Sequence, residues 1–84
     1  MKYELTTHAK ESLKKRSNIR LEWLERVISS PQLVQADSTD AELEHRIGKI
    51  EEFEGRVLRV IVNPNVDPTR VITAFFDRNM RNKL

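Results

Sequence analysis

The spacing of apolar residues changes along the chain, from helical steps in the first half to alternation in the second. Leu21, Leu24 and Ile28 lie three and four residues apart, which predicts a helix with one apolar side. Trp23 widens this apolar stripe and is expected to anchor the core. Pro31 disfavours helical geometry at the residue before it, so the helix is predicted to end there.

A shorter helix is predicted just before this one. The hydroxyls of Thr6 and Thr7 can accept hydrogen bonds from the free amides of a starting helix, so the helix is expected to begin here. It is expected to end near Arg16, because Ser17 and Asn18 favour a turn. Asn18 is then placed to cap the second helix.

Alternating apolar and polar residues, and a segment rich in β-branched residues at 56–62, predict β-strands in the rest of the chain. Around His45 the apolar positions alternate with charged ones, and Gly48 is expected to interrupt that strand with a bulge. A turn is predicted at residues 54–55, and two prolines indicate a loop at residues 63–68. The predicted strands cover residues 1–5, 32–36, 43–50, 56–62 and 71–76.

Together these elements predict one α+β domain over residues 1–84. A short N-terminal strand comes first, a two-helix hairpin follows, and an antiparallel sheet of three to four strands completes the fold. The two helices need a sheet to cover their apolar sides, so the two halves are expected to pack on each other. Residues 77–84 are basic and polar, and are expected either to form a short helix or to fray.

The composition is that of an ordinary folded domain, with 38% hydrophobic and 33% charged residues. Cysteine is absent, which excludes disulfides and thiolate metal sites. The acidic residues between 37 and 44 lack the glycine and terminal glutamate of a calcium loop, so no metal or other cofactor is expected. No apolar run reaches the length of a signal peptide or a membrane span, and the cytoplasm is the expected location.

The net charge is only +2, but it is unevenly distributed. Both ends of the chain are basic, whereas residues 36–54 are acidic. Such a sequence can fold into a basic face opposite an acidic one, which suits a nucleic acid on one side and a partner protein on the other. The alternative is a mixed, solvated surface.

A ribonuclease that works without metal requires a base for the ribose hydroxyl and fixed cations for the phosphate. Histidine suits the first role and arginine the second. His8 is the candidate base, with a surface or capping histidine as the alternative. His45 falls on the parity of core residues, and a structural histidine is the expectation. Arg56 and Arg59 lie on opposite sides of their strand, so at most one of them can join a single site on a sheet face.

Five stretches of the sequence, read together, carry a family resemblance: residues 3–9 (YELTTHA), Arg16, the helix before Pro31, residues 56–60 (RVLRV) and residues 71–78 (VITAFFDR). The chain resembles a family of short bacterial and cyanobacterial domains of unknown function that are similar to the BrnT and RelE/ParE toxins. This resemblance covers nearly the whole chain and implies a RelE-like fold.

The resemblance also implies roles for particular residues. His8 and Arg16 match the family's N-terminal histidine and helix-end arginine, and Thr73 matches the threonine of its last strand. Members of the wider group are ribonucleases, whereas the ParE branch poisons gyrase. The chain departs from the RelE pattern because its sole tyrosine is Tyr3, so a C-terminal catalytic tyrosine is missing.

These observations lead to the hypothesis of a toxin-like domain of a toxin–antitoxin module that cleaves or binds RNA without metal. The expected catalytic residues are His8, Arg16, Arg59 and Arg78, and the expected RNA contacts are Lys15, Thr73 and Arg81. The expected partners are an acidic antitoxin protein and RNA or the ribosome. The alternative is a non-catalytic module of the same fold that binds or regulates a partner protein, and a structural remnant without activity is a third reading.

Overall fold

A computed structural model of the chain describes residues 2–16 and 18–84. Met1, at the start of the predicted first strand, and Ser17, in the predicted turn, lie outside the described residues. The elements follow the order β1 (Tyr3–Leu5), α1 (Thr7–Lys15), α2 (Leu21–Ser29), β2 (Leu33–Ala36), β3 (Glu44–Ile50), β4 (Arg56–Asn63), β5 (Thr69–Phe76) and the 3₁₀-helix η1 (Arg78–Met80). This order confirms the predicted α+β class, with helices first and most strands after them.

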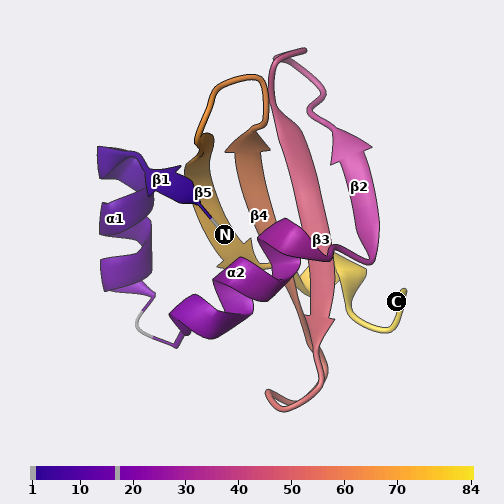
Figure 1. The fold of residues 1–84 in the computed structure, drawn as a ribbon. Helices are drawn as coiled ribbons and strands as arrows, with labels where there is room; N and C mark the ends of the chain where they lie inside the picture. Colours follow the sequence, from indigo (N-terminus) through magenta and orange to yellow (C-terminus); the bar gives the residue numbers. More distant parts are fainter. Residues whose placement is uncertain (1, 17) are drawn as a thin grey trace.

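The strands form one sheet with the order β1-β5-β4-β3-β2. Strands β2 to β5 are antiparallel neighbours, as predicted, and β1 adds a parallel fifth strand against β5. The sheet is therefore mixed and larger than the predicted three to four strands. The helices between β1 and β2 carry the chain across the sheet, so the first strand can pair with the last (Figure 1).

Helix α2 crosses one face of the sheet in front of β3 and β4 (Figure 1). Its apolar stripe is buried as predicted: Trp23, Leu24, Val27 and Ile28 are each at most 6% exposed. They pack on residues of β3, β4 and β5 that point to the same face, which are Ile50, Leu58, Val60, Val62, Val71 and Ala74. Burial of each large apolar side chain stabilises the fold by about 1.5–3 kcal/mol, so this contact is the centre of the core.

Helix α1 lies beside the outer edge of β5, where β1 has ended (Figure 1). Thr6 caps it, because its Oγ1 accepts a hydrogen bond of 3.0 Å from the amide of Ala9. The helix ends at Lys15, and its C-cap is Arg16, whose amide donates to the carbonyl of Ser12. The predicted cap of α2 is wrong: Arg20 occupies that position without a side-chain cap bond, and Asn18 stays outside the helix.

The predicted bulge at Gly48 is also wrong. Strand β3 pairs with β4 in regular register through Gly48, and the irregularity falls between Ile61 and Val62 in β4. Gly48 has a packing role instead, since a Cβ there would lie 3.0 Å from the side chain of Val27. Ile47 and Ile50 fall on opposite faces and are both fully buried, because the face away from α2 is partly covered as well.

Candidate functional site

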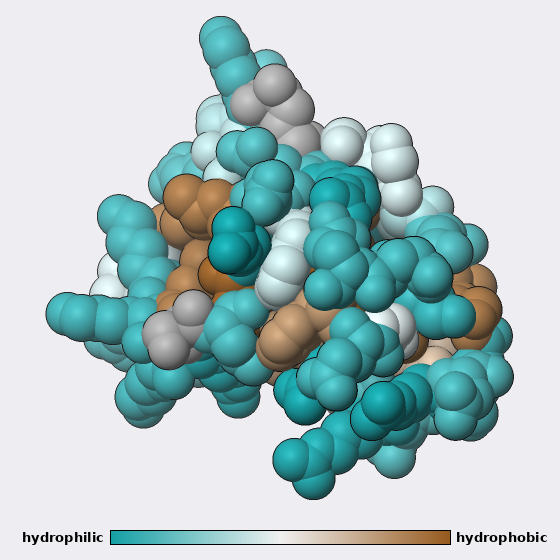
Figure 2. Space-filling view, turned by 90° about the horizontal axis from the view of Figure 1, so that it is seen from below, coloured by the Kyte–Doolittle hydropathy of each residue, from teal (hydrophilic) through white to brown (hydrophobic). Residues whose placement is uncertain are grey.

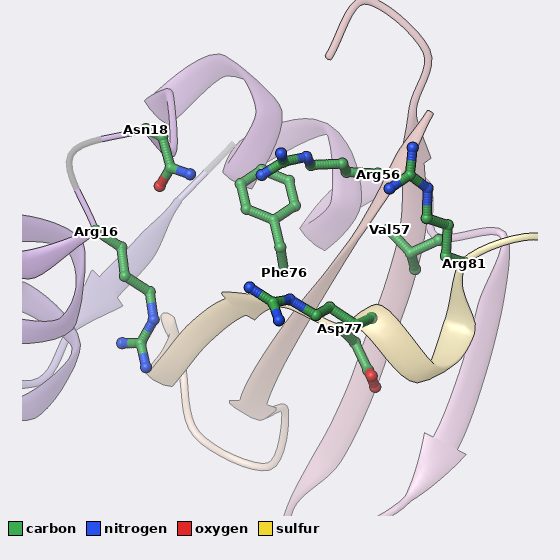
Figure 3. Close-up of a pocket in the computed structure, with 8 residues that line it drawn as sticks. Arg16, Asn18, Arg56, Val57, Phe76, Asp77 and Arg81 are labelled. Carbon is green, nitrogen blue, oxygen red and sulfur yellow. The ribbon is translucent and has the colours of Figure 1, made fainter. Parts of the chain in front are cut away.

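A cleft of about 570 Å³ opens where β5 ends and β4 begins, at the lower end of the sheet in Figure 1. Antiparallel register causes this arrangement: Leu58 pairs with Phe76, so the start of β4 lies beside the residues that follow β5. The connection between α1 and α2 forms the other side (Figure 3). The lining residues are Arg16, Asn18, Arg56, Val57, Phe76, Asp77, Arg78 and Arg81.

Four arginines from three separate segments line this arginine cleft. Arg16 is the C-cap of α1, Arg56 is the first residue of β4, and Arg78 and Arg81 belong to η1 and its C-cap. Figure 3 shows Arg16 on one side of the cleft, with Arg56 and Arg81 on the other. Within the described residues, only Arg56 of these four has an ion-pair partner, Glu54 at 3.7 Å.

One carboxylate, that of Asp77, also lines the arginine cleft, but its oxygens are already engaged. Oδ2 accepts a hydrogen bond of 2.8 Å from Arg59 Nε, and Oδ1 accepts one of 2.9 Å from the amide of Asn79. The side chains of Arg59 and Asp77 are only 13% and 12% exposed. The charge of Asp77 is therefore compensated by Arg59, and the arginine cleft is left cationic.

Aromatic rings support the cleft from the core. The ring of Phe76 lies 5.2 Å from that of Phe53 and 6.4 Å from that of Trp23, measured between centroids. The guanidinium of Arg56 lies 4.7 Å from the centroid of Phe53, within the range of a cation–π contact. This contact orients Arg56, so the cationic group is held in place before a ligand arrives.

Several planar guanidinium groups around a cleft are suited to binding phosphate. Each group presents paired donors that match the oxygens of a phosphate, and each keeps its charge at any physiological pH. Among residues 2–16 and 18–84, no group of three or more His, Cys, Asp or Glu side chains is placed to hold a metal ion. The chemistry available in the arginine cleft is therefore the binding and charge compensation of an anion.

Three of the residues predicted for the site meet in this cleft: Arg16, Arg78 and Arg81. Arg56, Asn18 and Phe76 were not predicted to join them. A signal for Arg56 was present in the sequence, because the residue directly follows a hairpin turn. In an antiparallel pair the start of one strand lies beside the end of the next, and β5 is followed by a segment that contains Arg78 and Arg81.

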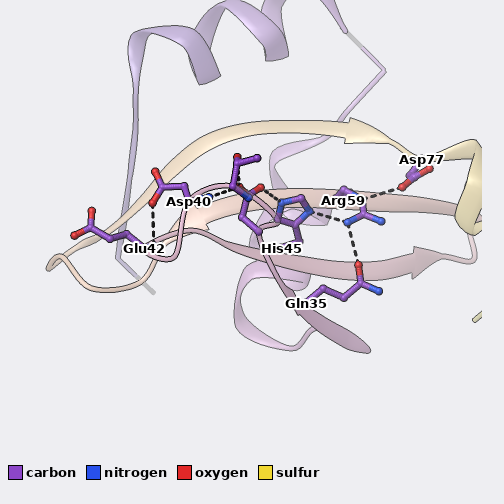
Figure 4. Close-up of polar contacts among 8 residues, drawn as sticks. Gln35, Asp40, Glu42, His45, Arg59 and Asp77 are labelled. Atoms are coloured by element: carbon purple, nitrogen blue, oxygen red, sulfur yellow. Dashed lines mark hydrogen bonds and ion pairs between the residues drawn. The ribbon is translucent and has the colours of Figure 1, made fainter.

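Arg59 and His45 belong to a hydrogen-bonded network on the face of the sheet away from α2 (Figure 4). Arg59 Nη1 lies 2.7 Å from His45 Nδ1 and 3.3 Å from Gln35 Oε1. A guanidinium can only donate, so Nδ1 accepts and the other ring nitrogen, Nε2, donates to Asp37 Oδ1 at 2.6 Å. Both nitrogens of His45 are therefore engaged, in agreement with the prediction of a structural histidine.

This network holds the pKa of Asp37 well below its usual range. The largest cause is the hydrogen bond from His45, and the amides of Thr39 and Asp40 and the hydroxyl of Thr39 add to it. All of these donors favour the ionised carboxylate. The network thus ties the loop after β2 to β3 and β4.

The other predicted site residues do not line the arginine cleft. His8 is exposed near the start of α1, about 12 Å along the helix from Arg16 at 1.5 Å per residue. Thr73 is half-buried, with its Oγ1 at 3.2 Å from the hydroxyl oxygen of Ser12. Lys15 is exposed at the last position of α1, next to Arg16. Their roles in catalysis or RNA binding stay predictions.

The fold and the arginine cleft together define a small α+β domain with a cationic cleft. The chain belongs to the family described as Domain of unknown function (DUF4258), whose model matches residues 5–76. No curated protein and no solved structure matches the chain significantly. The expected membership of a family of unknown function is thereby confirmed, and the similarity to BrnT and RelE/ParE toxins stays a prediction. None of the helices in the described part of the chain is long and apolar enough to cross a membrane.

Proposed function

We propose that this domain binds the sugar–phosphate backbone of RNA in the arginine cleft, as a toxin-like domain of a toxin–antitoxin module. The observation that carries the proposal is the convergence of four arginines from three remote segments on one concave surface. Arginines that serve only to keep a protein surface solvated have no reason to gather around one cleft. Here the residues surround one cleft, and the one carboxylate in its lining is compensated by Arg59.

The polarity of the surrounding surface also favours a nucleic acid. On the face seen from below in Figure 1, hydrophobic residues appear only as separate patches among hydrophilic ones (Figure 2). Phosphate binding needs cations with a polar surround, and this surface provides both. Arg16, Arg78 and Arg81 are all exposed and can reach a bound strand.

The cleft supports binding more directly than cleavage. The imidazole of His45 has no free nitrogen, and His8 lies near the opposite end of α1 from Arg16. Metal-free cleavage with His8 as general base, and with Arg16 and Arg78 on the phosphate, is the stronger form of the proposal. It requires that the bound RNA extend along α1. Arg59 then acts through Asp77, by fixing the wall of the arginine cleft.

An acidic antitoxin is the partner that this proposal expects. Carboxylates of such a protein would pair with the same arginines and displace RNA, which would make binding of the two ligands mutually exclusive. The alternative, a non-catalytic module for a partner protein, is favoured by a different feature. Strand β2 is an edge of the sheet, and its Val34 is 49% exposed, so a strand of a partner can be added there.

The proposal is tested with a short fluorescent single-stranded RNA and the double variant Arg16→Gln/Arg78→Gln. A charge-assisted hydrogen bond contributes about 1.5–3 kcal/mol, so we expect the affinity to fall at least tenfold. Arg16→Gln and Arg78→Gln are also measured singly against the control Arg70→Gln, which likewise removes one charge but lies exposed near the opposite end of β5. Equal affinities of the double variant and the control would contradict the proposal.

RNA cleavage is measured in the same preparations, with and without ribosomes. The stronger form predicts cleavage that His8→Ala abolishes while RNA affinity is retained. Intact RNA with tight binding leaves the binding proposal standing and removes the catalytic one. The alternative function, binding of a partner strand at the edge of β2, is tested with Val34→Lys. This variant would abolish capture of the partner strand and leave RNA binding unchanged.

A further inference from the structure

A second hollow, of about 520 Å³, lies next to the arginine cleft. Its lining residues are Asn18, Arg20, Glu22, Trp23, Glu52 and Phe53, and we call it the aromatic hollow. Asn18 lines both sites, so the two are contiguous along the connection between α1 and α2. The function proposed above does not use this second site.

The arginine cleft and the aromatic hollow also share a wall in the core. Phe76 lines the cleft, and its ring lies 5.2 Å from that of Phe53, which lines the hollow. Arg56, another lining residue of the cleft, lies over the same Phe53 ring. A ligand with two linked parts of different chemistry can therefore occupy both sites at once.

The two sites differ in charge. In the aromatic hollow, Glu52 accepts hydrogen bonds of 2.9 and 2.8 Å from both terminal nitrogens of Arg26. This contact lowers the pKa of Glu52 to about 2, so its charge is present and compensated. Glu22 and Arg20 form a second, looser pair at 3.5 Å. The hollow is thus close to neutral, whereas the arginine cleft is cationic.

A phosphate is consequently favoured in the cleft and disfavoured in the hollow, where two carboxylates face it. A flat neutral ring has the opposite preference, because Phe53 and Trp23 provide an apolar, aromatic surface. Trp23 is only 6% exposed and stacks against Phe53 at 5.2 Å, so it supports that ring from the core. Phe53 is half-buried and carries the guanidinium of Arg56 over its ring, so the contact surface for a base is the exposed part of Phe53 together with this planar guanidinium.

We infer that the aromatic hollow receives a nucleobase whose attached phosphate is held in the arginine cleft. This inference rests on the proposed function and specifies its ligand as single-stranded RNA with one base turned toward the protein. Bases inside a duplex are stacked and paired, so they cannot enter the hollow, whereas unpaired bases pack readily on aromatic side chains.

The polar residues of the hollow also predict which bases fit. The carboxylate of Glu22 is exposed and held only by the loose pair with Arg20, so it is available to accept hydrogen bonds. Adenine, cytosine and guanine each present an amino group to such an acceptor. Uracil has no amino group, and its single N3–H donor lies between two carbonyl oxygens that repel a carboxylate. The site therefore favours bases that carry an amino group over uracil.

Trp23 provides a direct readout, because it is the only tryptophan of the chain. The experiment compares three probes of equal length by Trp fluorescence and by affinity: oligoadenylate, oligouridylate and an abasic ribose–phosphate oligomer. We expect oligoadenylate to change the fluorescence and to bind about 5- to 100-fold more tightly than the abasic oligomer, since each stacked base contributes about 1–3 kcal/mol. Oligouridylate is expected between the two.

Variants separate the two sites. Phe53→Leu is expected to reduce the affinity for oligoadenylate more than the affinity for the abasic oligomer, which loses only the contact that orients Arg56. Phe75→Leu is the matched control, because Phe75 lies on the opposite face of β5 from Phe76. Since Phe53 also packs on the core, Glu22→Gln is a second variant at an exposed position, expected to reduce the preference for oligoadenylate over oligouridylate.

The outcomes distinguish this inference from the proposed function. Equal binding of oligoadenylate and the abasic oligomer, with Trp23 fluorescence unchanged, overturns the aromatic hollow as a base site and leaves the arginine cleft as a phosphate site. Failure of all three oligomers to bind overturns the proposed function itself. Preference for oligoadenylate that survives both Phe53→Leu and Glu22→Gln overturns the inference as well.

Discussion

Gly48 lies where α2 crosses β3, and the space for a side chain is taken by Val27. A Cβ at this position would lie 3.0 Å from Val27 Cγ2, inside the fully buried core. We expect Gly48→Ala to destabilise the fold by about 1–3 kcal/mol, because close-packed cores do not accept added atoms without strain. The free energy of unfolding in urea measures this effect.

Val27→Ala, alone and combined with Gly48→Ala, is the control for this explanation. It removes the atom that the added methyl group would meet, so the double variant should lose less stability than the sum of the two single variants. Strict additivity would show that the cost arises from the strand backbone and not from contact with α2.

Asp37 should make stability depend on acid. Its pKa is about 3.8 when unfolded and lower when folded, so the ionised form favours the native state. The stabilisation is complete above about pH 5 and declines as the pH falls below about 4, where the unfolded chain takes up the proton first. Asp37→Asn should therefore be less stable than the original chain at pH 7, by an amount that shrinks toward pH 3.

Urea unfolding between pH 7 and pH 3 checks this prediction. Glu4→Gln is a suitable control, because Glu4 is exposed and forms no ion pair among the described residues. A difference between Asp37→Asn and the original chain that stays constant with pH would mean that the carboxylate charge is unimportant.

At the level of elements, the start of α1 depends on one threonine. The sequence pattern leaves Thr6 and Thr7 as equal candidates for the cap, and the structure assigns the cap to Thr6. Its Oγ1 accepts from Ala9 and lies 3.3 Å from the carbonyl of Ile72, to which it donates. We expect Thr6→Ala to lower the free energy of unfolding by about 1 kcal/mol.

Thr7→Ala is the matched control, since Thr7 is exposed and forms no side-chain hydrogen bond within the described residues. We expect it to leave stability nearly unchanged. Because Thr6 also holds the end of β1 against β5, its loss should accelerate amide hydrogen exchange in both elements. Equal effects of the two variants would contradict the assignment of the cap.

At the level of the whole molecule, RNA binding should depend strongly on salt. Each phosphate neutralised on a single strand adds about −0.7 to the slope of log affinity against log salt, so four arginines predict a slope of about −3. By the same relation, we expect the Arg16→Gln/Arg78→Gln variant to reduce the steepness by about 1.4. A slope that is the same in the variant and the original chain would place the RNA on another surface.

The class of fold and most of its elements can be predicted from the order of residues alone, since helical and strand periodicity are local properties of neighbouring residues. Spacing at Leu21, Leu24 and Ile28 is sufficient for α2, alternation is sufficient for β3, and the richness in β-branched residues is sufficient for β4. The pattern does not predict why residue 48 is a glycine, because the space for a side chain there is taken by Val27 of α2.

Which charged groups meet depends on how the chain is folded in space. Arg16, Arg56, Arg78 and Arg81 converge because β4 and β5 are antiparallel and α1 ends beside them, whereas Arg59, further along β4, points to the other face and compensates Asp77. The sequence makes these arginines candidates, but it does not show that they lie around one cleft. Strand register and helix direction bring them together, and both are properties of the folded chain.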